Sequence, residues 1–264
     1  MSGKHPIQIS MNLSHALVDL VQKGVVPLDA IEVVDKVPVE RIRQAQAQLP
    51  GFPFHLHAGR AGLEWFLQKK LASHLEVCPQ TPVISVHLVP LPFAITWLAM
   101  KAKIFLPQPP TQMLVSNYIK KVKRLKASQS LPVILENIAV LHPKKYLMEA
   151  DPMVINRILE ETGCDLLLDL SHARIAAQVL GMAVEDYVGL LPLEKVVQVH
   201  VSGVRERDGR LYDAHQSLQE EDYALLEWAL TKVKPNWLTL EYFRENRDGI
   251  REQLTRLMAI ISSI

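Results

Sequence analysis

Eight short apolar runs recur along the chain, and most of them are rich in Val, Ile or Leu. Continuous runs of this length are typical of parallel strands that are buried on both faces of a sheet. The predicted strands are Ile7–Met11, Ile31–Val34, Phe54–His57, Val83–Leu88, Val133–Asn137, Leu166–Leu170, Val196–Val201 and Leu238–Tyr242.

The segments between these runs have apolar residues at helical spacing, so each can bury one stripe against the sheet. The predicted helices are Leu13–Val21, Val39–Ala47, Ala61–Leu75, Thr111–Lys126, Pro152–Thr162, Val184–Leu190, Asp222–Val233 and Arg247–Ile261. Eight strands alternating with eight helices predict an α/β fold, a (β/α)8 TIM barrel. Because no Gly- or Ser-rich linker divides the chain, we expect residues 1–264 to form a single TIM-barrel domain.

Residues that bind metal stand at the ends of these runs. Six runs stop at, or within one turn of, a His, Asp or Glu, and the segment YDAH adds two more such residues. The candidate ligands are His57, His87, Glu136, Asp169, His172, His200, Asp213, His215 and Glu241. The carboxyl ends of barrel strands meet at one mouth, where these side chains would converge. An open doubly wound sheet, the main alternative, gives no reason for ligands at six separated strand ends.

Taken singly, each of these residues has an ordinary structural explanation, but the joint pattern indicates metal. Four carboxylates converging without cations would repel one another strongly. The mixture of imidazole and carboxylate suits Fe, Mn or Zn better than Ca or Mg. Nine ligands exceed the roughly four to six that one ion takes, so we predict two or three divalent ions, with iron favoured over zinc or manganese. We expect catalysis to depend on Glu136, Asp169 and Glu241, while His55, one layer deeper than His57, packs or supports a ligand from behind.

The overall composition limits the classes of partner that we expect the chain to bind. Of the 264 residues, 48% are hydrophobic and 22% are charged, with 29 Lys and Arg against 28 Asp and Glu. A nearly neutral chain has no overall positive field for a polyanion, which makes nucleic acid a less favoured partner. The N-terminus lacks the pattern of a secretion signal, and no apolar run reaches the roughly 20 residues of a membrane span. We therefore expect a cytoplasmic protein with no membrane partner, in which Cys78 and Cys164 are structural thiols.

The order His, His, Glu, Asp-x-x-His, His, Asp-x-His, Glu resembles that of the xylose isomerase-like barrels typified by endonuclease IV, and all nine candidate positions have a counterpart there. The text around them is similar to another group. In three segments the chain resembles the multinuclear non-haem iron-dependent oxidases that include the methanobactin-biosynthesis enzyme. These segments read ETGCDLLLDLSHARIAAQVLG, DYVGLLPLEKVVQVHVSG and LYDAH. This chain departs from that family at His172, where the family has Asn, and at Val204, where it has His. An imidazole at position 172 binds an ion more firmly than an amide and favours a third site.

These resemblances imply three classes of function. An iron- and dioxygen-dependent oxidase would modify a peptide or small molecule and would be expected to act with a peptide-recognition partner protein. A phosphodiesterase of the endonuclease IV kind has its best support in the basic run Lys120, Lys121, Lys123, Arg124 and Lys126, although such a run is usually a solvated helix face. A sugar isomerase or epimerase would use Glu136 and Glu241 to move a proton.

Overall fold

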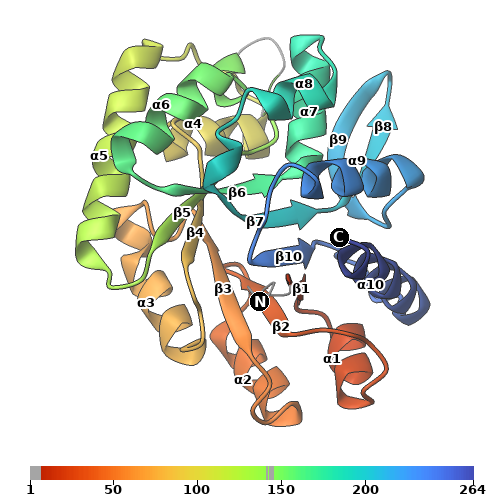
Figure 1. Cartoon of the computed structure of the whole chain (residues 1–264). Coiled ribbons are helices and arrows are strands. Elements are labelled where there is room, and N and C mark those ends of the chain that lie inside the picture. The colour runs from red at the N-terminus through yellow and green to blue at the C-terminus, as the bar shows by residue number, and fades with distance from the viewer. Residues whose placement is uncertain (1–6, 141, 143–145) are drawn as a thin grey trace, which may run out of the picture.

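The computed structural model describes residues 7–140, 142 and 146–264, and its centre is a closed barrel of eight parallel strands (Figure 1). Each predicted apolar run forms one strand, which confirms the TIM barrel. The strands are β1 (Gln8–Asn12), β2 (Ala30–Val34), β3 (Phe54–Gly59), β4 (Ile84–His87), β5 (Val133–Glu136), β6 (Asp165–Asp169), β7 (Val196–Val201) and β10 (Trp237–Leu240). Strands β1 to β7 pair in chain order, and β10 closes the barrel between β7 and β1.

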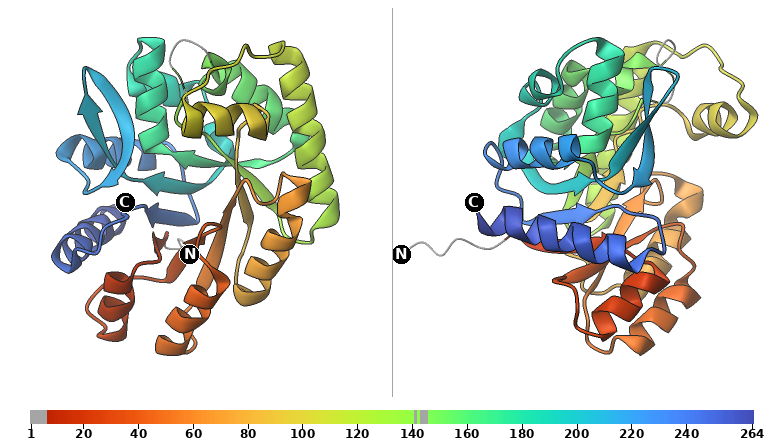
Figure 2. Two further views of the ribbon diagram at one scale, coloured as in Figure 1. Left: turned by 180° about the vertical axis from the view of Figure 1, so that it is seen from behind. Right: turned by 90° about the vertical axis from the view of Figure 1, so that its right-hand side faces the viewer.

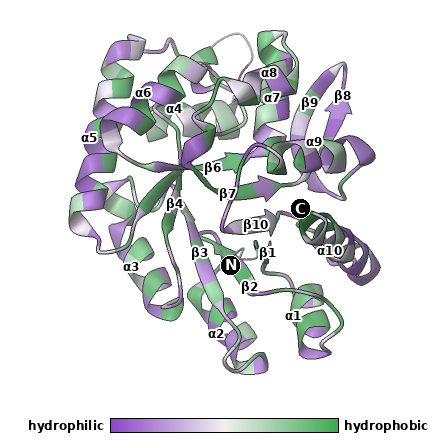
Figure 3. Ribbon diagram, in the orientation of Figure 1, coloured by the Kyte–Doolittle hydropathy of each residue, from purple (hydrophilic) through white to green (hydrophobic). Residues whose placement is uncertain are grey.

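Helices surround the barrel, as two further views show (Figure 2). They are α1 (His15–Gln22), α2 (Val39–Gln48), α3 (Gln68–Val77), α4 (Phe93–Trp97), α5 (Thr111–Ser128), α6 (Pro152–Thr162), α7 (Leu170–Leu180), α8 (Val184–Gly189), α9 (Glu220–Leu230) and α10 (Arg247–Ser262). The strands are largely hydrophobic, and the hydrophilic positions gather on the outer helices (Figure 3). This is the pattern expected when helices bury one stripe on a sheet that is covered on both faces. Among the described helices, none combines the length and the apolar character that crossing a membrane requires.

The structure corrects the predicted boundary after β6. The sequence pattern extended that strand through Leu170 and assigned no helix to the residues that follow, whereas Leu170 is the first residue of α7. The Asp169 side chain accepts a hydrogen bond from the backbone N–H of His172 at 2.7 Å and caps the helix. Strand β6 therefore passes into α7 without a loop, and this hydrogen bond holds Asp169 and His172 at the junction.

A second correction concerns the segment after β7. The sequence pattern assigned no strand to the residues that follow β7, but they form a two-stranded hairpin of β8 (Gly203–Arg207) and β9 (Arg210–Gln216). Asp208 and Gly209 have φ values of 52° and 72°, the left-handed conformation that a tight hairpin turn requires. The hairpin stands outside the barrel and carries Asp213 and His215.

The strand register brings the candidate ligands to one level of the barrel. His87 lies opposite Glu136, and Asp169 lies opposite His200. Because the strands are parallel, all of these residues stand at the carboxyl ends, and their side chains point to a common mouth.

Candidate metal centre

All nine predicted ligands lie at the carboxyl mouth of the barrel. Seven of them line a cleft of about 570 Å³: His57, His87, Glu136, His172, Asp213, His215 and Glu241. Asp169 and His200 lie beneath them and are fully buried. The nine residues fall into three groups, which we call cluster A (His57, His87, Glu136), cluster B (Asp169, His200, Glu241) and cluster C (His172, Asp213, His215).

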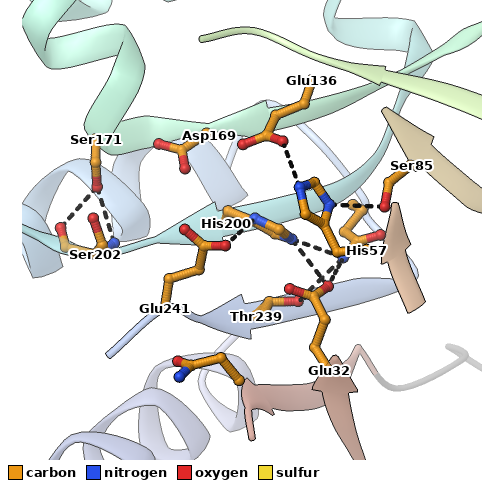
Figure 4. Close-up of polar contacts among 12 residues, drawn as sticks. Glu32, His57, Ser85, Glu136, Asp169, Ser171, His200, Ser202, Thr239 and Glu241 are labelled. Carbon is orange, nitrogen blue, oxygen red and sulfur yellow. Dashed lines mark hydrogen bonds and ion pairs between the residues drawn. The ribbon is translucent and has the colours of Figure 1, made fainter. Parts of the chain in front are cut away.

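Cluster A joins the ends of β3, β4 and β5. The Nε2 atoms of His57 and His87 are 3.0 Å apart, and Glu136 Oε2 lies 3.2 Å from the first and 3.4 Å from the second. Three donors bound to one ion at about 2.1 Å would stand roughly 3.0–3.4 Å from one another. His57 Nδ1 lies 2.9 Å from Ser85 Oγ, and a proton donated there leaves the Nε2 lone pair facing the cluster (Figure 4).

Cluster B joins the ends of β6, β7 and β10. His200 Nδ1 lies 3.4 Å from Glu241 Oε1, and ligand atoms of Asp169, His200 and Glu241 all lie within 4.8 Å of one another. The Asp169 carboxylate stands beside that of Glu136 on the neighbouring strand (Figure 4). Cluster B is thus the most deeply buried of the three.

Cluster C combines the α7 residue His172 with the two hairpin residues. Asp213 Oδ2 lies 2.8 Å from His215 Nε2 and 3.4 Å from His172 Nε2. His172 Nδ1 lies 2.9 Å from the carbonyl oxygen of Asn137, which can only accept, so this nitrogen carries the proton and Nε2 faces the cluster. His215 has a φ of 44°, a strained conformation for His, and its ring packs edge-on against Phe243 at 4.6 Å.

Glu136 connects clusters A and B and borders cluster C. Its Oε2 atom faces cluster A, and its Oε1 atom lies 3.5 Å from His172 Nδ1 of cluster C. Its donor atoms also lie within 4.8 Å of those of Asp169 in cluster B. A carboxylate in this position can bridge ions, as the excess of ligands over one coordination shell requires.

The electrostatics of the mouth are those of a site short of positive charge. Burial raises the pKa of Glu136 well above its usual range, and that of Asp169 also rises. Burial opposes charge on His200 and His172, but Glu32 and Asp169 respectively raise the pKa of these imidazoles well above the usual value. Protons thus serve as the cations of the site, and divalent metal would replace them.

Buried side-chain atoms without hydrogen-bond partners also indicate that the site binds metal. Within the described part of the chain, Glu136 Oε2, Asp169 Oδ2, His200 Nδ1 and His215 Nδ1 are buried and have no hydrogen-bond partner. Buried polar atoms in folded proteins are nearly always satisfied, so four such atoms around one cleft call for a ligand. Their chemistry, two imidazole nitrogens and two carboxylate oxygens, fits divalent metal.

Glu32 is a site residue that the sequence pattern did not single out. It lies in the middle of β2, is 1% exposed, and places Oε2 3.3 Å from His200 Nε2. Burial would raise the pKa of Glu32, but the charge and hydrogen bond of His200 outweigh it and hold the pKa below the usual range. His55, predicted to support a ligand from behind or to pack, lies 3.6 Å from the same oxygen and stacks at 4.9 Å on Trp237. The sequence feature that could have identified Glu32 is its position as the one carboxylate within the apolar run AIEVV.

A closed parallel barrel whose strand ends gather His, Asp and Glu side chains is the structure of a metal-dependent enzyme of the xylose isomerase-like class. Residues 55–259 match the family described as the RiPP precursor modification enzymes MbnB/TglH/ChrH. The chain belongs to this family, which confirms the resemblance seen in its sequence.

The chain is also similar to curated relatives and, in its fold, to solved structures. The UPF0276 protein of Acaryochloris marina is 24% identical over 213 residues, which cover 75% of this chain and 72% of that protein. The UPF0276 protein of Psychromonas ingrahamii is 26% identical over 159 residues, 55% of this chain and 54% of that protein. A xylose isomerase-like TIM barrel protein from Mycobacterium smegmatis, in complex with magnesium, superposes with a TM-score of 0.64 at 14% identity and covers 100% of this chain and 99% of its own. A D-tagatose 3-epimerase-like protein gives 0.63 at 15% identity, over 97% and 99%. At these identities the structural matches establish the fold alone.

Proposed function

We propose that the chain is a multinuclear metal-dependent oxidase that uses iron and dioxygen to modify a peptide. The observation that carries this proposal is the division of nine donor side chains into three adjoining clusters around Glu136. Membership in a family of precursor-modification enzymes supports a peptide as the substrate class. Two or three ions, with iron favoured over zinc or manganese, match the mixed imidazole and carboxylate donors.

Each cluster would hold one ion through its three side chains, and Glu136 would bridge. Iron bound there would supply the capacity to activate dioxygen and to exchange electrons with the substrate. The protein keeps the donors fixed. Asn137 holds the Asp169 backbone through two hydrogen bonds of 2.9 Å, and Ser171 Oγ bonds both the N–H and the carbonyl of Ser202, at 2.9 and 2.7 Å. These hydrogen bonds lock the ends of β6 and β7, which carry Asp169 and His200 of cluster B (Figure 4).

The rest of the cleft would orient the substrate. Leu13, Val37 and Phe243 give it an apolar wall, while Lys36 and Arg41 place two cations on the side formed by the segment after β2 and by α2. Glu136, Asp169 and Glu241 face the interior of the site, where they would receive or release protons as the substrate reacts. A peptide laid across this cleft would contact both the apolar wall and the clusters, and a partner protein that recognises the rest of the peptide remains part of the proposal.

A hydrolase of the endonuclease IV kind is the second candidate, and one observation favours it. The third cluster is completed by the imidazole of His172, whose Nε2 lies 3.4 Å from Asp213, at the position where the oxidase family has an amide. Three firmly held zinc ions would acidify a bridging water for attack on a phosphodiester. The basic residues of α5 give this reading little help, because Lys121 is paired with Glu64 at 3.0 Å and Lys126 bonds the carbonyl oxygens of Thr162 and Gly163.

Metal analysis of protein purified without air separates these candidates. Two or three iron ions per chain together with oxygen consumption would support the oxidase, and three zinc ions with cleavage of abasic DNA would support the hydrolase. Glu136→Ala and Asp169→Ala should each lose metal. His74→Gln is the matched control, because His74 is a buried imidazole that is not one of the nine donors and does not line the cleft. If both carboxylate variants keep their metal, the site is wrong.

A further inference from the structure

Glu32 lies beneath cluster B and outside the residues that match the family model. Its Oε2 atom is surrounded by polar groups: His200 Nε2 at 3.3 Å, Gln198 Nε2 at 3.1 Å and Thr239 Oγ1 at 3.5 Å (Figure 4). All of them are buried, so water does not compete for these contacts. The question is whether this carboxylate binds an ion itself or acts on a residue that does.

The orientation of Gln198 indicates that Glu32 accepts hydrogen bonds. An amide has one donor end and one acceptor end, and only the donor end can face a carboxylate oxygen at 3.1 Å without repulsion. With the N–H group of Gln198 directed at Oε2, a cation at the same oxygen would be repelled by the amide hydrogens. The Oε2 atom of Glu32 therefore suits a proton donor better than a metal ion.

His200 presents its two ring nitrogens to opposite sides. Nε2 faces Glu32, and Nδ1 lies 3.4 Å from Glu241 Oε1 and has no hydrogen-bond partner in the described part of the protein. A neutral imidazole carries one proton, so the tautomer decides which side receives a lone pair. We propose that Glu32 is a positioning residue that holds the proton of His200 on Nε2 and so leaves the Nδ1 lone pair facing Asp169 and Glu241. This inference rests on the proposed metal site and adds to it a residue that fixes one ligand.

Gln198 is the competitor for Nε2. Its amide nitrogen lies 2.9 Å from His200 Nε2, 3.1 Å from Glu32 Oε2 and 3.1 Å from Thr239 Oγ1, so two amide hydrogens face three acceptors. If one hydrogen went to His200, the ring proton would move to Nδ1 and face the ligands. A hydrogen bond to an ionised group is roughly twice as strong as one between neutral groups, so the His200 proton belongs with Glu32, and the amide hydrogens belong with Glu32 and Thr239.

Nitrogen NMR of the zinc-loaded protein, with histidines labelled with ¹⁵N, reads the tautomer directly. The wild type should show His200 protonated on Nε2 and bound to zinc through Nδ1. Glu32→Gln should lower the affinity for one ion about 10- to 100-fold, the range typical of groups that orient a ligand, as measured by zinc content against a chelator series. The swapped pair Glu32→Gln with Gln198→Glu returns a carboxylate to Nε2 and should restore that ion. Glu64→Gln, which neutralises a buried carboxylate outside the site, should leave all ions bound.

The outcomes separate this inference from the proposed function. A wild type that binds no metal overturns both. A wild type that binds its metal, with a proton on His200 Nδ1 or with Glu32→Gln retaining every ion at wild-type affinity, overturns only the role of Glu32. Circular dichroism will show whether Glu32→Gln folds. If it does not, Glu32→Asp keeps the charge but withdraws it by one methylene, and it should give a smaller loss of the same ion.

Discussion

Asn137 ties the end of β5 to the end of β6, and removing its side chain should damage both stability and metal binding. Its Nδ2 donates to the Asp169 carbonyl and its Oδ1 accepts from the Asp169 N–H, both at 2.9 Å. Asn137 is 1% exposed and Asp169 is fully buried. In Asn137→Ala, the Asp169 N–H would therefore be left without a partner in a place that water does not reach. The Asp169 carbonyl would lose one of two hydrogen bonds, because as the N-cap of α7 it also accepts the first bond of that helix.

The expected size of the effect follows from these two groups. A buried donor that loses its partner costs about 1–3 kcal/mol, and a hydrogen bond to a carbonyl that keeps another donor contributes about 0.5–1.5 kcal/mol, so Asn137→Ala should lower the free energy of unfolding by about 1.5–4.5 kcal/mol. Asn12 supplies the matched control. It is 1% exposed at the end of β1, and its Oδ1 accepts one hydrogen bond of 2.7 Å, from the N–H of Tyr242. Asn12→Ala should lose less, about 1–3 kcal/mol.

Urea unfolding followed by circular dichroism measures both variants, once in excess chelator and once with zinc. The loss in Asn137→Ala should be larger with zinc, because the carbonyl that fixes the His172 tautomer and the backbone that carries Asp169 both shift. The reasoning is refuted if Asn137→Ala is no less stable than Asn12→Ala, or if its zinc affinity is that of the wild type.

Three further predictions concern the hairpin, the shared carboxylate and a buried imidazole. A methyl group at Gly203 would collide with the backbone oxygen of Ser217, so Gly203→Ala should displace the hairpin and lose one ion; a full metal content would contradict this. Glu136→Gln should lose more than one ion, whereas Glu64→Gln, at a buried carboxylate outside the site, should lose none, as metal analysis will show. Burial lowers the pKa of His55 to about 4 from 6.5, so between these values the unfolded chain binds a proton that the folded chain does not. Stability should therefore fall by up to about 3 kcal/mol as the pH drops through this window, and parallel unfolding curves for wild type and His55→Gln would argue against it.

The barrel was readable from the sequence because parallel strands buried on both faces leave short, continuous apolar runs. The convergence of the nine candidate ligands could be predicted because strand ends meet at one mouth, whatever the details of packing. Helix α7 was missed because Asp169 is at once the last strand residue and the helix cap, so no loop marks the change. The hairpin was missed because strands exposed to solvent carry charges, as Arg205 and Arg207 do, and resemble a loop.

Glu32 was not identified from the sequence, for a different reason. Candidate ligands were sought where apolar runs stop, and Glu32 lies inside a run, with β2 continuing to Val34. Its partners, His200, Gln198 and Thr239, come from strands far away in sequence, and only closure of the barrel between β7, β10, β1 and β2 brings them together. The spacing of residues along the sequence does not indicate which side chains meet across the barrel.

The hairpin of β8 and β9 lets Asp213 and His215 move relative to the barrel, which the candidate ligands on the barrel strands cannot do. Its strands pair only with each other among the described residues, so moving Asp213 and His215 need not break a ladder bond of the barrel. Its attachments include Gln178 of α7, which bonds Leu211 and Gly209, the Ser202 hydroxyl, which donates to Asp213 at 3.3 Å, and the His215 carbonyl, which accepts from the Phe243 N–H. Clusters A and B are therefore as rigid as the barrel. Cluster C can be assembled last and released first, so the affinity of the third ion would depend on the freedom of this hairpin.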